Sequence, residues 1–365
     1  MRLLVTALCT IVILGVYSCN EDFTVAAPYR HITIVSGILD MGDTAHYIRI
    51  QKAFMDENNS AISMSKIPDS SFYPAADLDV TIYEWDSAQA KVTGTFPLTR
   101  VDMNTEDTRY IKNPAISEQQ FFTTPNYAYK FVKNNLSPRH WYQLVIHNKQ
   151  TGNIDTSDFV GIVNSDSNRA GDGFYIQDFT LRDYSIGFAR TTPTSRYRLF
   201  TFMPRNGRMT EGYIRFNYVE KDITTGVKTR KHVDYAFDKE LNVTKGGQSF
   251  ELQTLNYNIY SFLNSSIGPA PTNIERYMDS ADLFIYAAAP ELYYYNTINQ
   301  GQSGGLTGDN IQPNYTNFKG NNVIGVLSSR GVRSYYNAAI EKVTLDSIMI
   351  NPATESLRFR GMTED

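Results

Sequence analysis

Gly212-Tyr213-Ile214-Arg215-Phe216-Asn217-Tyr218-Val219 alternates between apolar or aromatic residues and polar ones. This period of two is typical of a strand that buries one face and exposes the other. The turn residues Thr224-Thr225-Gly226 follow, and residues 227–237 form a second strand-like run. The pair is the clearest β-hairpin in the sequence, so this part of the chain is predicted to be organised around antiparallel sheet.

Segments on both sides of this hairpin extend the β-rich pattern. Strand-like runs lie at 175–182, 185–190 and 197–202 before it and at 282–288 after it. Apolar residues at helical spacing also follow the hairpin and predict a stripe that packs on a sheet. They are Leu252, Leu255, Ile259, Phe262 and Leu263.

The end of the chain contains a second helix signal. Pro290 suits the first position of a helix over residues 291–299, and residues 300–322 form a Gly- and Asn-rich loop. Segments 323–327 and 341–350 close the fold. We therefore predict a β-rich domain over residues 166–352 with one or two short helices, followed by a C-terminal tail over residues 353–365.

The N-terminal half shows the same period-two pattern in shorter strands. Residues 31–38 and 46–52 predict a hairpin, and residues 55–76 predict a long excursion with one helical turn. Further strands are predicted at 79–85, 92–98, 127–132, 141–147 and 158–163. This spacing predicts an immunoglobulin-like β-sandwich over residues 29–165, although no cysteine pair supports a true immunoglobulin domain. The Ser-, Asp-, Asn- and Gly-rich residues 164–173 mark the domain boundary.

The first residues carry a targeting signal. Arg2 precedes an apolar run from Leu3 to Val16 that is too short to span a bilayer, and Cys19 follows where this run ends. An ordinary secretory signal or an uncleaved anchor is less favoured, because Val16 and Tyr17 do not give the spaced small residues of an ordinary cleavage site. The division predicted here is a signal peptide over residues 1–18 and a tether over residues 19–28.

Three groups of residues carry a family resemblance: Cys19-Asn20-Glu21-Asp22, His46-Tyr47-Ile48-Arg49-Ile50, and Asn314-Tyr315-Thr316-Asn317 with the later Gly325 and Ser328-Ser329-Arg330. The chain resembles an uncharacterised family of Bacteroidota outer-membrane surface lipoproteins with an immunoglobulin-like N-terminal half. The resemblance implies that Cys19 is lipidated and that Asn20, Glu21 and Asp22 are the surface-export signal. It also implies an accessory role beside a TonB-dependent transporter.

Composition removes several classes of function. The net charge of −4 at pH 7 disfavours binding to nucleic acid. The two cysteines are Cys9, within the signal, and Cys19, so the mature chain has no disulfide and no cysteine metal site. We predict no cofactor.

Motifs for catalysis and metal binding are weak. Gly301-Gln302-Ser303-Gly304-Gly305 matches the nucleophile-elbow pattern but lacks the strand-to-helix context, and no histidine follows it. The five histidines are scattered without metal-ligand spacing. Carboxylates for glycosidic cleavage cannot be recognised from spacing alone. We therefore assign no catalytic and no metal-binding residue.

Aromatic and amide residues near the second helix favour ligand binding. Tyr293, Tyr294 and Tyr295 occur with Asn310 and Asn314, the residue types that hold a glycan or peptide. The alternative is that at least one of these tyrosines lies in the core, since a triplet on a helix points in several directions.

The hypothesis from sequence is a lipid-anchored outer-membrane protein that faces the cell exterior. It would act as a non-catalytic binding or accessory component of a TonB-dependent uptake system. Two alternatives remain: an extracellular glycan or peptide hydrolase, and an adhesin or envelope structural protein. An enzyme requires a concave site with convergent titratable groups, whereas a binding protein requires exposed aromatic and amide groups.

Overall fold

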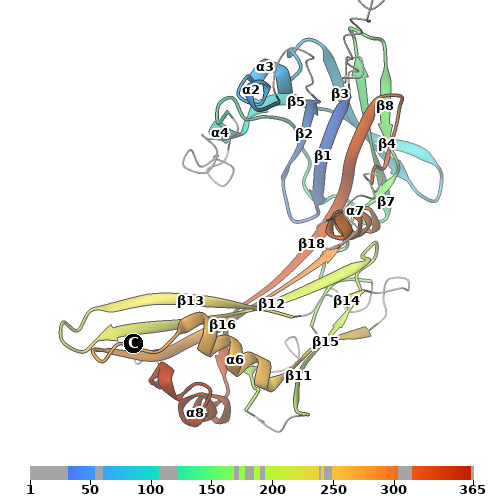
Figure 1. Cartoon of the computed structure of the whole chain (residues 1–365). Helices are drawn as coiled ribbons and strands as arrows, with labels where there is room; N and C mark the ends of the chain where they lie inside the picture. Colours follow the sequence, from blue (N-terminus) through green and yellow to red (C-terminus); the bar gives the residue numbers. More distant parts are fainter. Residues whose placement is uncertain are drawn as a thin grey trace, which may run out of the picture.

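The chain folds into two β-rich regions, one above the other in Figure 1. The computed structural model describes residues 32–53, 61–106, 122–167, 172–176, 185–189, 194–237, 240–241, 249–302 and 315–362. Strands dominate both regions, and a few short helices lie at their edges and on one face. The predicted fold class, mainly β with a sandwich-like N-terminal region and a β-rich second region, is confirmed.

One long strand, β18 (Val323–Ile340), belongs to both regions. Its first part pairs in parallel with β1 (Thr33–Asp40), from Val323 to Arg330. Its second part pairs antiparallel with β16 (Ile274–Ala288), from Arg330 to Ala338. A single sheet therefore runs through the molecule in the order β13-β12-β16-β18-β1-β2-β6-β5.

The N-terminal region is a sandwich of two sheets. The first sheet contributes β1 with β2 (Ala45–Lys52), β6 (Tyr127–Val132) and β5 (Thr99–Asp102). The second contains β17 (Phe318–Lys319), β8 (Ile154–Ser157), β7 (His140–Asn148), β3 (Leu78–Asp86), β4 (Lys91–Pro97) and β9 (Val160–Gly161). Their inner faces bury a common core that includes Val35, Ile48, Ile82 and Leu144.

Short helices accompany this sandwich. They are α2 (Ala61–Met64), α3 (Pro68–Ser71) and α4 (Met103–Glu106). The first two fall within the predicted excursion at 55–76. Residues 54–60 and 107–121 lie outside the described part of the chain.

The C-terminal region is a sheet that is covered on one face. Its strands are β12 (Met209–Asp222), β13 (Lys228–Ala236), β16, β18, β10 (Ser185–Ile186), β14 (Glu240–Leu241) and β19 (Phe359–Met362). The elements that supply the rest of this region are α6 (Asn256–Ile267), α7 (Pro290–Gln302), α8 (Lys342–Ile350), η3 (Glu355–Leu357), β11 (Arg196–Phe202) and β15 (Ser249–Leu255).

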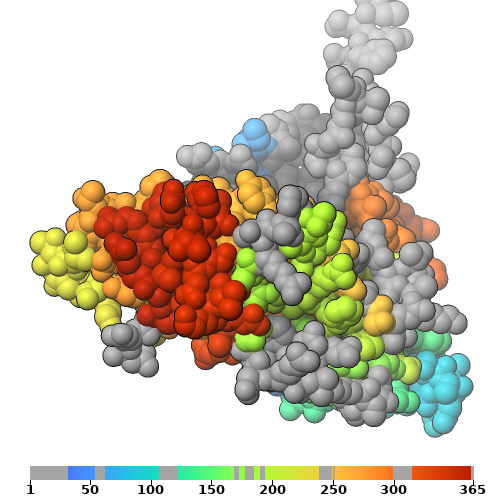
Figure 2. All heavy atoms as spheres, turned by 90° about the horizontal axis from the view of Figure 1, so that it is seen from below, coloured from blue at the N-terminus to red at the C-terminus, as the bar shows by residue number. Residues whose placement is uncertain are grey.

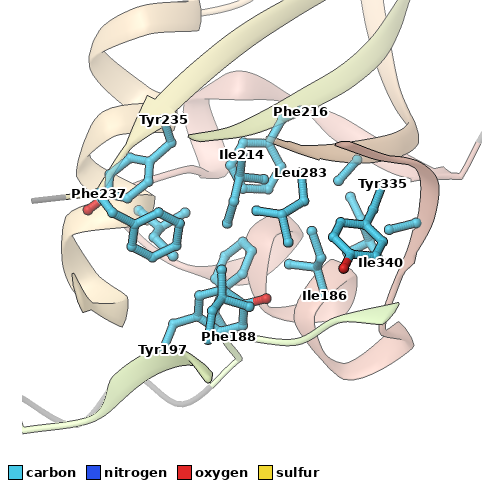
Figure 3. Close-up of a cluster of buried hydrophobic side chains, with 14 of the residues drawn as sticks. Ile186, Phe188, Tyr197, Ile214, Phe216, Tyr235, Phe237, Leu283, Tyr335 and Ile340 are labelled. Atoms are coloured by element: carbon cyan, nitrogen blue, oxygen red, sulfur yellow. The ribbon is translucent and has the colours of Figure 1, made fainter. Parts of the chain in front are cut away.

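The core of this region lies between the sheet and its covering elements. Ile214, Phe216 and Leu283 project from the sheet towards Phe188 and Tyr197 (Figure 3). The C-terminal segment, red in Figure 2, forms much of the underside of the molecule. The opposite face of the sheet carries the polar and partly exposed residues of β12 and β13.

The helical stripe predicted across 252–263 was wrong in its first part. Leu252 and Leu255 belong to β15, which pairs with β11, and the helix begins at Asn256. Leu252, Ile259 and Leu263 are nevertheless all buried in the same core. A strand leading directly into a helix produced an apolar spacing that imitates one helix.

The structure corrects two ranges that the sequence predicted to be a tail and a loop. Residues 353–362, expected to be a tail, contain η3 and β19, and Leu357 and Phe359 are buried in the C-terminal core. Within the predicted loop at 300–322, Phe318 and Lys319 form a strand that pairs with β8, and Val323 to Arg330 of β18 pair with β1 of the N-terminal sandwich. The division at residues 165 and 166 stays a prediction about separately folding units.

Candidate binding site

The open face of the C-terminal sheet presents aromatic and charged side chains. Ile214 and Phe216 point into the core and are fully buried, so Tyr213, Arg215 and Asn217 take the opposite face. The register places Tyr213 beside Phe284 and Glu211 beside Tyr286 on β16. Pairing of two long strands thus brings side chains that are about seventy residues apart in sequence onto one surface.

Four aromatic residues form what we call the aromatic face: Tyr213, Phe284, Tyr286 and Tyr336. The Tyr213 and Tyr286 rings meet edge to face with centroids 5.8 Å apart, and Phe284 and Tyr336 do the same at 5.7 Å. Tyr336 is 62% exposed, and the other three are partly exposed. Edge-to-face pairs hold the rings in fixed orientations, so the aromatic face is preorganised.

The charge on this face is compensated within the face. Arg215 donates from Nε and Nη2 to the two carboxylate oxygens of Asp234, both at 2.8 Å, and its guanidinium lies 5.3 Å from the Phe284 ring centroid. The hydrogen bond from Arg215 is the main reason that the pKa of Asp234 lies below its usual value, and the same bond raises the pKa of Arg215. Both groups are therefore charged at neutral pH, and their charges cancel.

Other polar groups of the face are also oriented. Tyr213 donates its hydroxyl to Glu211 Oε2 at 2.9 Å, and burial together with this hydrogen bond raises the pKa of Tyr213 to about 12. Asp282 accepts from Asn217 Nδ2 at 3.1 Å and from the Asn337 N–H at 3.0 Å. Each carboxylate oxygen has further lone pairs, so these groups can still accept hydrogen bonds from a ligand.

A wide depression of about 510 Å³ lies on this surface. Its lining is Glu211, Tyr213, Arg215, Asp234, Phe284 and Tyr286. The depression combines flat apolar rings with hydrogen-bonding groups at their margins. This combination binds ligands that have an apolar face and polar edges.

The sequence-predicted tyrosines lie on a different element. Tyr293, Tyr294 and Tyr295 belong to the first half of α7, which packs against β18 where the two regions join (Figure 1). Tyr294 and Tyr295 are 44% and 37% exposed, whereas Tyr293 is partly buried and has the Arg208 guanidinium 5.6 Å from its ring. The triplet thus points in more than one direction, and its role in binding stays a prediction.

The remaining predicted site residues lie outside the described residues. These are Asn310 and Asn314 of the ligand site, Cys19 of the lipidation site, and Asn20, Glu21 and Asp22 of the export signal. Their assignments stay predictions.

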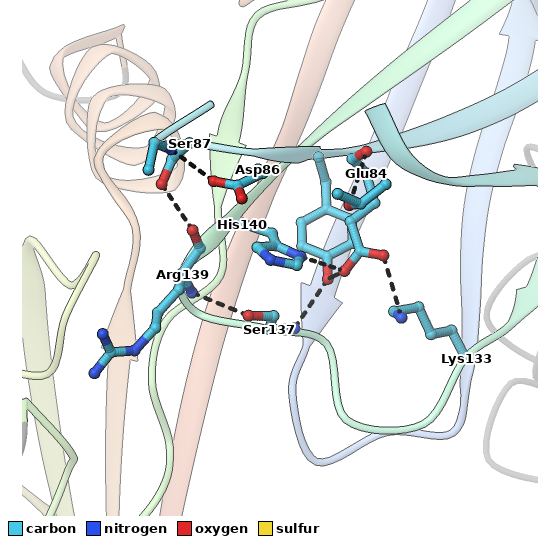
Figure 4. Close-up of polar contacts among 10 residues, drawn as sticks. Glu84, Asp86, Ser87, Lys133, Ser137, Arg139 and His140 are labelled. Carbon is cyan, nitrogen blue, oxygen red and sulfur yellow. Dashed lines mark hydrogen bonds and ion pairs between the residues drawn. The ribbon is translucent and has the colours of Figure 1, made fainter. Parts of the chain in front are cut away.

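A buried polar cluster in the N-terminal sandwich is the second arrangement with chemical interest (Figure 4). Glu84, which is 5% exposed, accepts from the Tyr142 hydroxyl at 2.6 Å and contacts His140 Nδ1 at 2.9 Å and Lys133 Nζ at 3.3 Å. Burial alone would raise the pKa of Glu84, but the three partners outweigh burial and hold its pKa below the usual 4.5. Glu84 is therefore an ionised, fully engaged carboxylate.

The contacts around Glu84 favour a structural role. The Tyr142 oxygen also accepts from the Ser137 N–H at 2.9 Å, so the cluster fixes the turn between Lys133 and His140 against β3 and β7. The hydroxyl of Ser87 donates to the Arg139 carbonyl at 2.8 Å and thereby anchors the same turn. A histidine held by a carboxylate occurs in hydrolases, but there it orients a nucleophile, and these contacts orient a loop.

Metal binding and membrane crossing can be assessed only for the described residues. Within those ranges, no three His, Cys, Asp or Glu side chains gather in a group that could hold a metal ion. Across the same ranges, no helix has both the length and the apolar character needed to cross a membrane.

Comparisons with known proteins assign no family to this chain. No family model matches the chain, and no curated protein matches it. Among solved structures, CBD12 from CALX1.2 is aligned over 80% of this chain and 99% of that chain, with 9% identity and a TM-score of 0.17. A similarity at this level carries no argument about fold or function, so the functional argument rests on the residues of the aromatic face.

Proposed function

We propose that the chain is a non-catalytic binding protein and that the aromatic face binds a neutral oligosaccharide. The observation that carries the proposal is the preorganised set of Tyr213, Phe284, Tyr286 and Tyr336 beside the compensated Arg215–Asp234 pair. The apolar faces of sugar rings pack on aromatic rings, and sugar hydroxyls bond to carboxylate and amide groups at the margin.

The charge balance supports a neutral ligand. Arg215 gives Nε and Nη2 to the two oxygens of Asp234, so its positive charge is already compensated and attracts an anionic group only weakly. Glu211 and Asp282 add negative charge to the same surface and would repel an anion. A ligand with hydroxyl groups gains hydrogen bonds here without disturbing the ion pair.

The position of the face supports a glycan over a peptide. Peptides commonly bind a sheet by adding a strand to an edge whose main-chain groups are unpaired. β12 and β16 are interior strands, paired to β13 and β18 on their other sides. Only side chains are available on this surface, and these side chains are rings with polar neighbours.

The proposal for cellular context comes from the first residues of the chain. The apolar run up to Val16, Cys19 and the acidic Glu21 and Asp22 support a lipid-anchored protein on the outer face of the outer membrane. In that setting, a glycan-binding surface would deliver ligand to a TonB-dependent transporter. This partner is supported by the family resemblance of the sequence alone.

Affinity electrophoresis tests the ligand class directly. The mature chain is run through native gels that contain xylan, mannan, starch or a mixed-linkage β-glucan, and retardation gives the affinity. The double variant Tyr213→Ala, Tyr286→Ala is expected to lose at least about tenfold in affinity, which is about 1.4 kcal/mol. The control is Tyr257→Ala, because Tyr257 is a 57% exposed tyrosine on α6.

The outcomes separate the possibilities. Retardation that the double variant loses and the control keeps supports the proposal. The proposal fails if none of the four polysaccharides retards the wild-type chain, or if the double variant is retarded as strongly as wild type.

For the cellular context, surface protease accessibility and a pull-down are compared between wild type and Cys19→Ala. Protection from protease in the wild type would contradict surface display.

A further inference from the structure

A second concavity lies on the outer face of the N-terminal sheet. Val35 and Ile48 point into the sandwich core, so Ser36 and Ile38 of β1, with Tyr47 and Arg49 of β2, take the other face. The register sets Ser36 directly opposite Arg49. These residues line a pocket of about 350 Å³ whose other walls include Met103, Asn126, Ala128 and Arg330.

Arg49 is the unusual residue of this pocket. Its Nη2 donates to Asn126 Oδ1 at 2.6 Å, and Asn126 is only 1% exposed. Among the described residues, no carboxylate forms an ion pair with Arg49, and burial lowers the pKa of its guanidinium. A partly desolvated charge without a counter-ion costs free energy. A bound anion would supply the counter-ion that Arg49 lacks.

The support for Arg49 is built by its neighbours. The Asn126 N–H donates to Asp102 Oδ1 at 3.1 Å, and Asn126 Nδ2 donates to Asn104 Oδ1 at 3.3 Å. These bonds leave the Asn126 carbonyl oxygen directed at the guanidinium. Arg49 is therefore held by a neutral amide that fixes its position without cancelling its charge.

The other basic groups of the pocket, Arg330 and His46, already have partners. Arg330 pairs with the buried Asp40 at 3.3 Å. His46 bonds through Nε2 to the Lys133 carbonyl at 3.0 Å, and burial lowers its pKa, so it is neutral at pH 7. Asp43 lies at the wall and forms no ion pair with Arg49 in the described part of the chain. Arg49 is thus the one lining cation among these groups that lacks a charged partner.

We propose that this pocket binds the carboxylate of a small organic acid, with Arg49 as the group that receives it. The planar fork of arginine matches the two oxygens of a carboxylate, and one unpaired guanidinium compensates one negative charge. A phosphate dianion would need a second cation, but Arg330 is engaged by Asp40. Ile38, Met103 and Ala128 supply apolar walls for the carbon skeleton, and Ser36 supplies a hydroxyl, whereas the Tyr47 hydroxyl already donates to Glu106 Oε2 at 3.4 Å.

This site is independent of the aromatic face. Arg49 lies on β2 in the N-terminal region, whereas Tyr213 and Tyr286 lie on β12 and β16 in the C-terminal region. Either binding activity can therefore fail without affecting the other. The two sites also differ in charge, because only the N-terminal pocket offers an uncompensated cation.

Isothermal titration calorimetry on the full mature chain at pH 7 tests the proposal. The probes are D-glucuronate, D-glucose as the same ring without a carboxylate, and inorganic phosphate. Glucuronate is expected to bind and glucose is not, because the carboxylate supplies the contact to Arg49. Arg49→Gln is expected to weaken glucuronate binding at least about tenfold, as removal of a charge-assisted pair does.

Two further variants distinguish a loss of affinity caused by the Arg49 guanidinium from one caused by a change in net charge. Arg139→Gln is the matched control, because Arg139 is an exposed arginine of the same region and its loss changes the net charge equally. Arg49→Lys keeps the charge but not the fork, and an intermediate affinity is expected. Melting curves of every variant establish that each is folded.

Three results would overturn the carboxylate assignment. One is the absence of glucuronate binding by the wild-type chain. Another is binding that Arg49→Gln and Arg139→Gln weaken equally, which would reflect net charge alone. The third is tighter binding of phosphate than of glucuronate, which would assign the pocket to inorganic anions.

Discussion

The outer faces of the two regions use arginine in opposite ways. On the C-terminal sheet, Arg215 is partly exposed and paired with both oxygens of Asp234. On the N-terminal sheet, Arg49 is half-buried in a pocket and bonded to the neutral Asn126. The first arrangement removes charge from a surface of aromatic rings, and the second preserves charge inside a cavity. This difference is the basis on which we propose a different ligand chemistry for each face.

A third arginine, Arg276, is buried and has a full set of partners, as expected for a structural role. Arg276 is 3% exposed, and its Nε donates to Glu220 Oε1 at 3.0 Å. Its Nη1 donates to the carbonyls of Gly268 at 2.7 Å and Leu357 at 3.3 Å. Arg276 therefore ties β16 to the end of α6 and to η3, and its charge is fully engaged.

The largest expected effect comes from breaking that engaged arginine. Arg276→Ala would leave Glu220 without its buried partner and two carbonyls without a donor, so the free energy of unfolding should fall by about 3–5 kcal/mol. Urea denaturation measures this change. Arg360→Ala is the control, since the Arg360 side chain is 52% exposed and pairs with Glu275 at 3.5 Å. A loss below about 1 kcal/mol in Arg276→Ala would contradict the structural role.

The buried carboxylate of the N-terminal region should matter next. Glu84→Gln removes the charge that Tyr142, His140 and Lys133 engage, and a loss of about 1.5–3 kcal/mol is expected at pH 7. The control is Asp346→Asn, where a 46% exposed carboxylate pairs with Lys342 on the surface of α8.

The pH dependence of this loss is also fixed in sign. The folded-state pKa of Glu84 lies below 4.5, so its contribution is complete above pH 4.5 and disappears as pH falls through the folded-state pKa. The difference between wild type and Glu84→Gln should therefore shrink in denaturation series at successively lower pH. A difference that stays constant down to pH 3 would refute the assignment of an ionised Glu84.

Much of the fold was predictable because alternation is a local property. The hairpin at 212–237 and the strands at 46–52, 79–85 and 141–147 emerge in β12, β13, β2, β3 and β7. The helix α8 and the buried C-terminal residues were not found, because their apolar patterns are short. The passage of β18 through both regions depends on pairing between distant segments, which no local pattern encodes.

The candidate sites were less predictable for the same reason. Alternation in residues 212–219 places Tyr213 and Arg215 on one face, but only the register with β16 adds Phe284 and Tyr286. Arg49 stands in a regular alternating strand and looks like a solvated residue. Its significance comes from Asn126, which is distant in sequence and reaches it from the residue before β6.

Removing Asp234, the counter-ion of Arg215, tests the C-terminal half of the contrast between Arg215 and Arg49. Asp234→Asn would leave Arg215 charged and unpaired, so the aromatic face should bind neutral polysaccharide about two- to fivefold more weakly because the guanidinium loses its fixed position. The same variant should gain weak affinity for D-glucuronate. Affinity gels and calorimetry measure the two changes. Unchanged behaviour in both assays would show that the ion pair has no influence on ligand choice.

The smallest expected effect is the most diagnostic. Arg49→Gln should change the free energy of unfolding by less than about 0.5 kcal/mol, because relief of the half-buried, unpaired charge offsets the loss of its hydrogen bond to Asn126. The role of Arg49 should instead appear as a difference in stabilisation by bound ligand. Glucuronate at a hundred times its wild-type Kd should stabilise the wild-type chain by about 2.7 kcal/mol, and the variant, which binds at least about tenfold more weakly, by no more than about 1.4 kcal/mol. If Arg49→Gln instead unfolded the chain as Arg276→Ala does, Arg49 would be a structural residue and the contrast between the two faces would disappear.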